Sequence, residues 1–538
     1  MPAHAAGPNL RSPAEVTQVA RGVSRIADVL RHHPGSTSRA FIKDPGRWQV
    51  SFSDPRGKEI AQVYVSDATG EVLEAWTGFQ VAWTMARGYD GAFGHKVTSL
   101  WVWLPLCLLF LAPFVTPRRP WRLLHLDLLV LLAFSVSLAF FSSGTIGLSV
   151  PLAYPVLLYV LGRMLWIGSG RGRGGRDDVL RLNVRASWLA VGVLFLVGFR
   201  VGLNVVNSNV IDVGYSGVIG AQKILHGEDL YGGWPREDEH GDTYGPANSL
   251  AYVPAVAALG WSGRWDDLPA AHAAAILFDL LTLGGLFLLG RRVRGPTLGV
   301  ALAWAWVAYP FTLFASSTNA NDSLVSLLVV GALLGAGSAP ARGLAIGLAG
   351  MAKLAPLGLA PLFFPGVTRR TGDARGELRR ETLTYCVVFL LTCAAMLGLA
   401  ALLGSGPREI WQRTIGFQAA RGSPFSVWGL WGWPGPQKVV QGAAVLFCLS
   451  LALVPRGART TPRLAALAAA ALIALQLGVD HWFYLYIVWF FPAVMVALLA
   501  GGPPRSIPPA SASHVASGSP LPAPTGPPPR SRTAPASV

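Results

Sequence analysis

The sequence predicts an all-α polytopic membrane protein that begins with a small α+β unit. Of its 538 residues, 52% are apolar and only 13% are charged, whereas soluble domains carry about 25% charged residues. The apolar residues fall into runs long enough to cross a bilayer, and loops rich in Arg, Pro and Gly separate these runs. A single soluble core would not require runs of this length, so we expect a multi-pass protein.

The charge balance is strongly basic, with 44 Lys and Arg against 28 Asp and Glu, which gives a formal net charge of +16. In a membrane protein this excess indicates short cytoplasmic loops that face anionic lipid. We therefore expect membrane lipids, and no nucleic acid, among the partners. All four cysteines lie inside apolar runs, where they behave as small buried hydrophobes and not as disulfide or metal partners: Cys107, Cys386, Cys393 and Cys448.

Residues 1–97 form the predicted α+β unit. Apolar residues recur at helical spacing between Pro13 and Leu30, and alternation around Val50 and Val63 predicts strands. The stretch GRWQVSFSDPRGKEIAQVYVSDATGEVLEAWTG resembles PepSY-like domains, which implies one helix and a meander with a D-x-T-G turn. Such domains are usually accessory modules. No apolar stretch typical of a cleavable signal peptide appears in this unit.

The remaining chain divides into three predicted parts. Residues 98–185 hold three accessory transmembrane helices with a basic loop, 186–501 form the transmembrane core, and 502–538 form a disordered Pro-rich tail. The predicted spans are 98–115, 124–142, 145–166, 187–206, 271–290, 297–317, 323–338, 382–404, 437–454, 463–479 and 484–501. Residues 248–261 are too short to span and predict an interfacial amphipathic helix. Glycines and prolines interrupt 342–365, which predicts two short helices that meet near Lys353.

Short Arg-rich loops set the predicted orientation because such loops stay cytoplasmic. With the interfacial and interrupted segments placed as above, all of these loops fall on one side of the plasma (inner) membrane. The loops 207–270, 318–322 and 405–436, the Asp480-His481 pair and residues 1–97 then share the outer side.

The outer loop 207–270 holds most of the concentrated acidic residues of the chain. A solvated loop that avoids positive charge in order to cross the membrane would explain most of them. Asp212 stands apart, because it follows the helix that ends at Val206 and lies within the apolar string VIDVGYSG. A carboxylate in such surroundings has a raised pKa that suits a general base.

Four strings resemble, in order, the polyprenyl-phosphate-mannose-dependent mannosyltransferases of glycosyltransferase family 87, within the GT-C superfamily. They are IDVGYSGVIGAQKILHGEDLY, DTYGPANSLAYVP, NANDSLVSLLVV and GLAIGLAGMAKLAPLGLAPLFF. The resemblance covers roughly residues 186–501 and implies a GT-C-like helical core with a large first outer loop. It implies an inverting transfer of a hexose, with mannose first, from a polyprenyl-phosphate sugar to an envelope lipid or glycan acceptor. Asp212 takes the place of the superfamily's base, and no metal or cofactor is expected.

Cations near the outer surface could hold the donor phosphate without a nucleotide-binding fold. Lys353 lies between two short helices at membrane depth, where a charge is costly and by default indicates a functional site. Arg200 lies near the outer end of its helix. For both residues the structural alternative is snorkelling to the interface, and for Arg200 it is the favoured one.

Several further side chains complete the predicted site. Arg421, flanked by Gly422 and Pro424 in a preorganised turn of the aromatic-rich loop 405–436, is a candidate phosphate ligand. His481 could orient a hydroxyl or assist proton transfer, or be a hydrogen-bonded interfacial histidine. Further substrate-binding candidates are Gln418, Tyr244 and Asp322.

Two of the polar clusters have simpler explanations. Asn319, Asn321 and Asp322 are first explained as a helix cap. Glu237-Asp238-Glu239 resembles the acidic pairs that hold a metal in some GT-C enzymes, although we expect none here.

Two other function classes stay open. A multi-pass transporter or flippase of a lipid-linked or polar substrate would use the interrupted segment at Lys353 as its binding site. No internal repeat supports it, and the acidic residues gather in one outer loop. The other alternative is a non-catalytic envelope protein whose N-terminal unit senses or tethers.

Overall fold

The computed structural model describes residues 10–88, 94–116, 121–171, 180–235, 238–263, 265, 268–364, 374–454 and 459–501. Predictions for Glu237 and for the tail from Gly502 onward lie outside the described residues. Within them the chain is mostly helical, with one small antiparallel sheet near the N-terminus, as the composition predicts.

The N-terminal unit has two helices and a four-stranded meander. The helices are α1 (Pro13–Arg21) and α2 (Ser24–His32); the strands are β1 (Thr37–Asp44), β2 (Arg47–Ser53), β3 (Glu59–Ser66) and β4 (Val72–Thr77), in the order β1-β2-β3-β4. The single expected helix is interrupted at Gly22 and Val23. Strand β1 was not expected, because its residues are nearly all exposed and so show no apolar alternation.

The helical body follows the predicted spans closely. Its long helices are α4 (Leu100–Leu111), α5 (Leu123–Ser142), α6 (Ile146–Gly168), α7 (Ala186–Val206), α10 (Pro269–Arg294), α11 (Pro296–Ala308), α12 (Pro310–Ser317), α13 (Asp322–Leu334), α14 (Ala339–Ala352), α16 (Ala374–Leu402), α20 (Pro434–Ser450), α21 (Thr461–Leu477) and α22 (Ile487–Leu499). Among the described residues, 5 helices are long and apolar enough to cross a membrane, or up to 6 if a bent pair is one span. These helices are compatible with a multi-pass membrane protein.

The bent pair corrects one predicted span. Residues 297–317 form two helices, α11 and α12, which meet at an angle of 58°. Tyr309, between them, has φ −72° and ψ 123°. Pro310 disfavours helical geometry in the residue before it and supplies no N–H to the preceding turn, so the helix must change direction here.

The interrupted segment agrees with the prediction. Helix α14 ends at Ala352, Lys353 is extended (φ −140°, ψ 145°), and two short pieces follow, η6 (Ala355–Leu359) and α15 (Ala360–Phe363). The predicted interfacial helix is α9 (Pro246–Leu259). It packs against α8 (Asp212–His226) and α10, and its place at a membrane interface stays a prediction.

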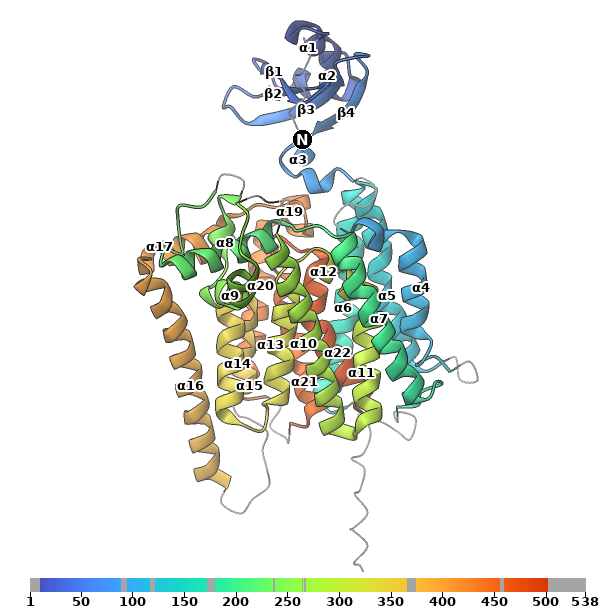
Figure 1. Ribbon diagram of the computed structural model, residues 1–538, viewed down its shortest axis with the longest axis vertical. Coiled ribbons are helices and arrows are strands. Elements are labelled where there is room, and N and C mark those ends of the chain that lie inside the picture. The colour runs from blue at the N-terminus through green and yellow to red at the C-terminus, as the bar shows by residue number, and fades with distance from the viewer. Residues whose placement is uncertain are drawn as a thin grey trace, which may run out of the picture. The chain divides into compact units, whose positions relative to one another are not determined.

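The shorter helices of the predicted outer loops gather at one end of the long ones. Figure 1 shows α8, α17 (Pro407–Trp411) and α19 (Val427–Trp431) there, with α3 (Phe79–Ala82) at the same end. Between α17 and α18 (Phe417–Ala420) lies one π-helical turn, Gln412–Gly416. Loops that are distant in sequence thus meet over one end of the helices.

The three helices before residue 186 pack directly on the core. Helix α6 runs along α21. The Tyr484 hydroxyl lies 2.7 Å from Ser137 Oγ and 2.8 Å from Ser149 Oγ, and Trp304 Nε1 donates to the Leu109 carbonyl. Described as accessory from the sequence, these helices share one buried core with α11, α21 and α22.

Candidate functional site

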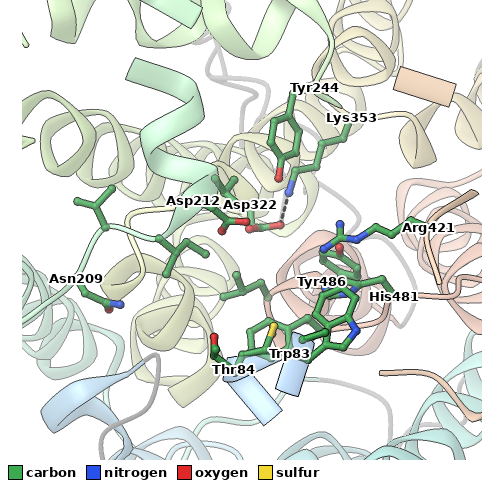
Figure 2. Close-up of a pocket in the computed structure, with 17 residues that line it drawn as sticks. Trp83, Thr84, Asn209, Asp212, Tyr244, Asp322, Lys353, Arg421, His481 and Tyr486 are labelled. Atoms are coloured by element: carbon green, nitrogen blue, oxygen red, sulfur yellow. Dashed lines mark hydrogen bonds and ion pairs between the residues drawn. The ribbon is translucent and has the colours of Figure 1, made fainter. Parts of the chain in front are cut away.

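A cavity of about 340 Å³ opens where these loops meet (Figure 2). Its polar lining comes from segments that are distant in the sequence: Asn209, Asp212, Tyr244, Asp322, Lys353, Arg421 and His481. Trp83 and Tyr486 add aromatic walls. Six of the eight predicted site residues therefore line one cavity, whose volume falls in the range of small-molecule sites.

Asp212 is the first residue of α8, and its position depends on a close backbone contact. The N–H of Ile211 donates to the Thr318 carbonyl. A Cβ at Gly214 would lie 2.3 Å from the Asn319 carbonyl oxygen, so only glycine allows α8 to approach this turn. Asn319 itself has a left-handed φ of 52°. The D-V-G spacing thus brings the Asp212 carboxylate beside the start of α13.

Glycines also set the packing of α8 on α9. Gly217 faces the Tyr252 ring and Gly220 faces Ser249, at distances where an added Cβ would clash. Since residues three apart share one face of a helix, these two glycines and Gly214 make a close-packing stripe.

The environment of Asp212 makes its carboxylate a stronger base than an ordinary aspartate. Desolvation by the cavity walls raises the pKa of this carboxyl above its usual value, and the negative charge of Asp322 adds to the effect. The N–H of Val213 and the charges of Arg421 and Lys353 oppose the shift. Since the residue stays exposed to water inside the cavity, the shift is moderated. A carboxyl of this kind can accept a proton from a bound hydroxyl.

Lys353 is paired and enclosed by aromatic rings. Its Nζ lies 2.7 Å from Asp322 Oδ1, which also accepts a hydrogen bond from Trp489 Nε1 at 2.7 Å. Rings of Tyr244, Tyr486 and Trp489 lie 4.9 to 5.7 Å from Nζ. The second carboxylate oxygen of Asp322, Oδ2, is buried and has no hydrogen-bond partner among the described residues. The pair leaves little net charge at this wall of the cavity.

Tyr244 reaches the cavity because its neighbour is glycine. A Cβ at Gly245 would lie 1.9 Å from the Met351 carbonyl oxygen, so the chain before α9 presses directly on the end of α14. The Tyr244 carbonyl accepts a hydrogen bond from the Tyr231 hydroxyl at 3.0 Å. This contact places the ring over Lys353 (Figure 2).

Arg421 faces the cavity between two aromatic rings. Its Cζ lies 5.3 Å from the Trp83 ring centroid and 5.9 Å from that of Phe417. Within the described part of the chain, no hydrogen bond or ion pair engages its guanidinium. It is therefore the cation of this cavity with donors to spare for an anion.

His481 is held beside Arg421 as a neutral ring. Its Nδ1 lies 2.9 Å from Ser423 Oγ, and its ring packs edge-on against Phe425. Burial, reinforced by the positive charge of Arg421, lowers the pKa of His481 to about 3. At neutral pH this imidazole can accept or donate a hydrogen bond, but it cannot act as a charged acid.

Two predicted substrate-binding residues do not line the cavity. Gln418 is exposed and donates to Thr243 Oγ1 at 2.7 Å. Arg200 is 2% exposed and forms a buried ion pair, with Nη2 2.6 Å from Asp279 Oδ1. Neither phosphate binding nor snorkelling describes Arg200, because its charge is satisfied inside the protein.

The helix-cap interpretation of 319–322 is also corrected. Asn321 is the N-cap residue of α13 but makes no side-chain cap bond. Its Nδ2 donates instead to Asn248 Oδ1 at 2.7 Å, and Asp322 engages Lys353. Asn319 is part of a network that ties the 316–319 turn to Asn204 and Ser208. These polar residues therefore position the cavity wall.

No site role was predicted for Trp83 or its neighbours. Ala82, Trp83, Thr84 and Met85 all line the cavity, although they belong to residues 1–97, the predicted α+β unit, for which no part in the site was predicted. The sequence pattern that could have identified them is a cluster of large apolar side chains in a connecting segment, where polar residues are usual.

The acidic cluster of loop 207–270 is partly engaged in contacts outside the cavity. Ser216 Oγ donates to Asp238 Oδ2, and burial raises the pKa of Asp238 to about 6. The Gly232 N–H donates to Asp242 Oδ2. Across the residues that the structure describes, no group of three His, Cys, Asp or Glu side chains is placed to hold a metal ion.

Comparisons with known proteins add no assignment: no family model matches the chain, and no curated protein matches it.

Proposed function

We propose that this chain is a multi-pass glycosyltransferase of the GT-C type in the plasma (inner) membrane. It transfers a hexose, with mannose as the first candidate, from a polyprenyl-phosphate sugar to a hydroxyl of an envelope lipid or glycan on the outer side. One observation carries the proposal: a carboxylate with a raised pKa, Asp212, shares a cavity with the Arg421 guanidinium, which has no ion-pair partner among the described residues.

The two groups suit the two ends of an inverting transfer. Asp212 takes the proton of the acceptor hydroxyl while that oxygen forms a bond to the anomeric carbon of the sugar. The bond between this carbon and the phosphate oxygen breaks on the opposite face, and the polyprenyl phosphate leaves with one more negative charge. Arg421 stabilises this growing charge through its free N–H donors.

The other residues that line the cavity can bind and orient the sugar. Asp322 lines the cavity and pairs with Lys353, so it fixes the wall against which a sugar would lie. The neutral imidazole of His481 can orient a second hydroxyl. The position of the cavity at one end of long apolar helices suits a donor whose lipid chain stays in the bilayer.

The test is transfer from radiolabelled polyprenyl-phosphate sugars, with several hexoses, by the purified full-length protein in lipid nanodiscs. Asp212→Asn should lower the rate by about 10²- to 10⁴-fold, the usual contribution of a general base. Glu239→Gln, an exposed carboxylate of the same loop that does not line the cavity, is the matched control and should retain activity. Full activity of Asp212→Asn would remove the base from the mechanism.

A transporter or flippase is the second candidate, and the break at Lys353 favours it. Interrupted helices commonly form the binding sites of transporters, and Lys353 lies both at this break and in the cavity. A flippase would move a fluorescent lipid phosphate across a liposome membrane and release no glycosylated product. The cavity lined by the outer loop counts against the non-catalytic alternative.

A further inference from the structure

The segment between the sheet and the first long helix forms one wall of the cavity. It consists of α3 (Phe79–Ala82), Trp83 and the short helix Thr84–Ala86. Four of its residues line the cavity, and the Trp83 ring lies against Arg421 and His481 (Figure 2).

This segment is fixed on both sides. Arg87 is 8% exposed; its Nε donates to the Gln80 carbonyl and its Nη2 to the Val81 carbonyl, while its guanidinium also bonds Gln62 in β3. On the other side the backbone of Gly88 contacts that of Gly144, at the turn between α5 and α6, so closely that a Cβ would lie 2.2 Å from its nitrogen. The sheet and the helical body therefore hold the indole in place.

Trp83 orients Arg421 without neutralising it. A carboxylate partner would cancel the positive charge and occupy the N–H donors. Aromatic faces attract a guanidinium through the ring quadrupole and leave the in-plane donors free. The rings of Trp83 and Phe417 lie 5.3 Å and 5.9 Å from Cζ. Asp480 and Asp212 are near enough to feel the charge of Arg421, but neither forms an ion pair with it.

The other cation of the cavity cannot take this role. Lys353 is paired with Asp322 at 2.7 Å, so an incoming anion would have to compete with a buried carboxylate. Arg421 therefore has to supply most of the attraction for an anionic group. Five donors in a planar fork suit the oxygens of a phosphate ester.

We propose that Trp83 is a positioning residue that, together with Phe417, holds Arg421 ready for the phosphate of a lipid-linked substrate. The inference deepens the proposed function and rests on it for the identity of the lipid phosphate. It follows that the N-terminal α+β unit contributes to substrate binding, because contacts of this unit hold the Trp83 indole in place.

The experiment measures phosphate binding apart from sugar transfer. The full-length protein in nanodiscs is titrated with farnesyl phosphate, and separately with inorganic phosphate, while its thermal unfolding is followed. Trp83→Leu keeps an apolar side chain but removes the ring, and Trp83→Phe keeps a ring. Phe79→Leu is the matched control, because Phe79 lies in the same α3 helix, is 39% exposed and does not line the cavity.

We expect Trp83→Leu to weaken farnesyl phosphate binding about tenfold, in keeping with a partly desolvated cation–π contact. Trp83→Phe should stay within about threefold of the wild type because it retains an aromatic face. Phe79→Leu should bind as the wild type does. In an Arg421→Ala background, Trp83→Leu should have no further effect, because coupled residues lose their contribution together.

Unchanged farnesyl phosphate affinity in Trp83→Leu would overturn the inference. So would an equal loss of affinity when Trp83→Leu is added to Arg421→Ala, since Trp83 would then act independently of Arg421. If the wild type bound inorganic phosphate as tightly as farnesyl phosphate, the proposal that the phosphate belongs to a lipid-linked substrate would be overturned. Trp83-dependent binding of farnesyl phosphate without transfer of any sugar would refute the proposed function and leave the positioning role intact. Sugar transfer by the wild type, together with unchanged farnesyl phosphate binding in Trp83→Leu, would refute the positioning role of Trp83 and leave the proposed function intact.

Discussion

Lys353 at the break after α14 and Asp322 at the start of α13 form a buried ion pair, with 2.7 Å between Nζ and Oδ1. Lys353→Met should therefore lower the free energy of unfolding by about 3–5 kcal/mol, because it leaves Asp322 charged and buried without a partner. The double variant Lys353→Met/Asp322→Leu should regain much of this loss. Denaturant unfolding in detergent measures both, and a double variant no more stable than Lys353→Met would contradict the pairing.

Arg200 and Arg421 should respond to truncation in opposite ways. Arg200→Ala should cost about 3–5 kcal/mol of stability, since it leaves the buried carboxylate of Asp279 without its cation. Arg421→Ala removes no ion pair and should leave stability nearly unchanged while it raises the donor KM at least about tenfold, as expected for a lost charge-assisted contact. Thermal unfolding and donor kinetics of both variants separate the roles. An unchanged donor KM in Arg421→Ala would argue against phosphate binding there.

Gly245→Ala tests the backbone contact that places Tyr244. A Cβ at Gly245 would lie 1.9 Å from the Met351 carbonyl oxygen, so the two segments must separate. We expect lower thermal stability and a reduced rate of sugar transfer, because Tyr244 and Lys353 both lie next to this contact. Gly284→Ala is the control: Gly284 lies within α10 with no atom near its Cβ position, and alanine there should add about 0.5–1 kcal/mol. A Gly245→Ala variant as stable as Gly284→Ala would refute the contact.

The pH profile of sugar transfer should show one acid limb. The base must be deprotonated, and the pKa of Asp212 is raised by its surroundings, so kcat/KM should rise with pH, with a midpoint above that of an ordinary aspartate, and then level off. His481, whose pKa is lowered to about 3, stays neutral between about pH 5 and 8 and should add no second limb there. His481→Gln should therefore keep the midpoint. Loss of the acid limb in that variant would assign the titration to the histidine.

Much of the helical body was predictable from the sequence because length and apolarity are local properties. The break at Lys353 was predicted from the glycines and prolines of residues 342–365. The bend at Tyr309 could have been predicted from Pro310. Strand β1 could not be recognised, because an exposed edge strand needs no apolar alternation.

The candidate site was predictable only in part. Asp212 is distinguished from other acidic residues by its apolar flanks, and the resemblance to a known family pointed to the same residue. No pattern in the nearby sequence identified which residues pair with the buried charges. Asp322 follows a cap-like string yet pairs with Lys353, and Arg200 resembles a snorkelling residue yet pairs with Asp279, 79 residues later.

The sequence by itself determined which segments are apolar enough to be helices, where one of them breaks, and which carboxylate lies just beyond the end of one of them. Only the tertiary structure decided that Lys353 pairs with Asp322, that Arg421 has no ion-pair partner within the described part of the chain, and that Trp83 from the N-terminal segment reaches the same cavity. The physical reason is that a helix forms from interactions within a few residues, whereas a buried charge is stabilised by whichever side chain the packing of distant helices brings beside it.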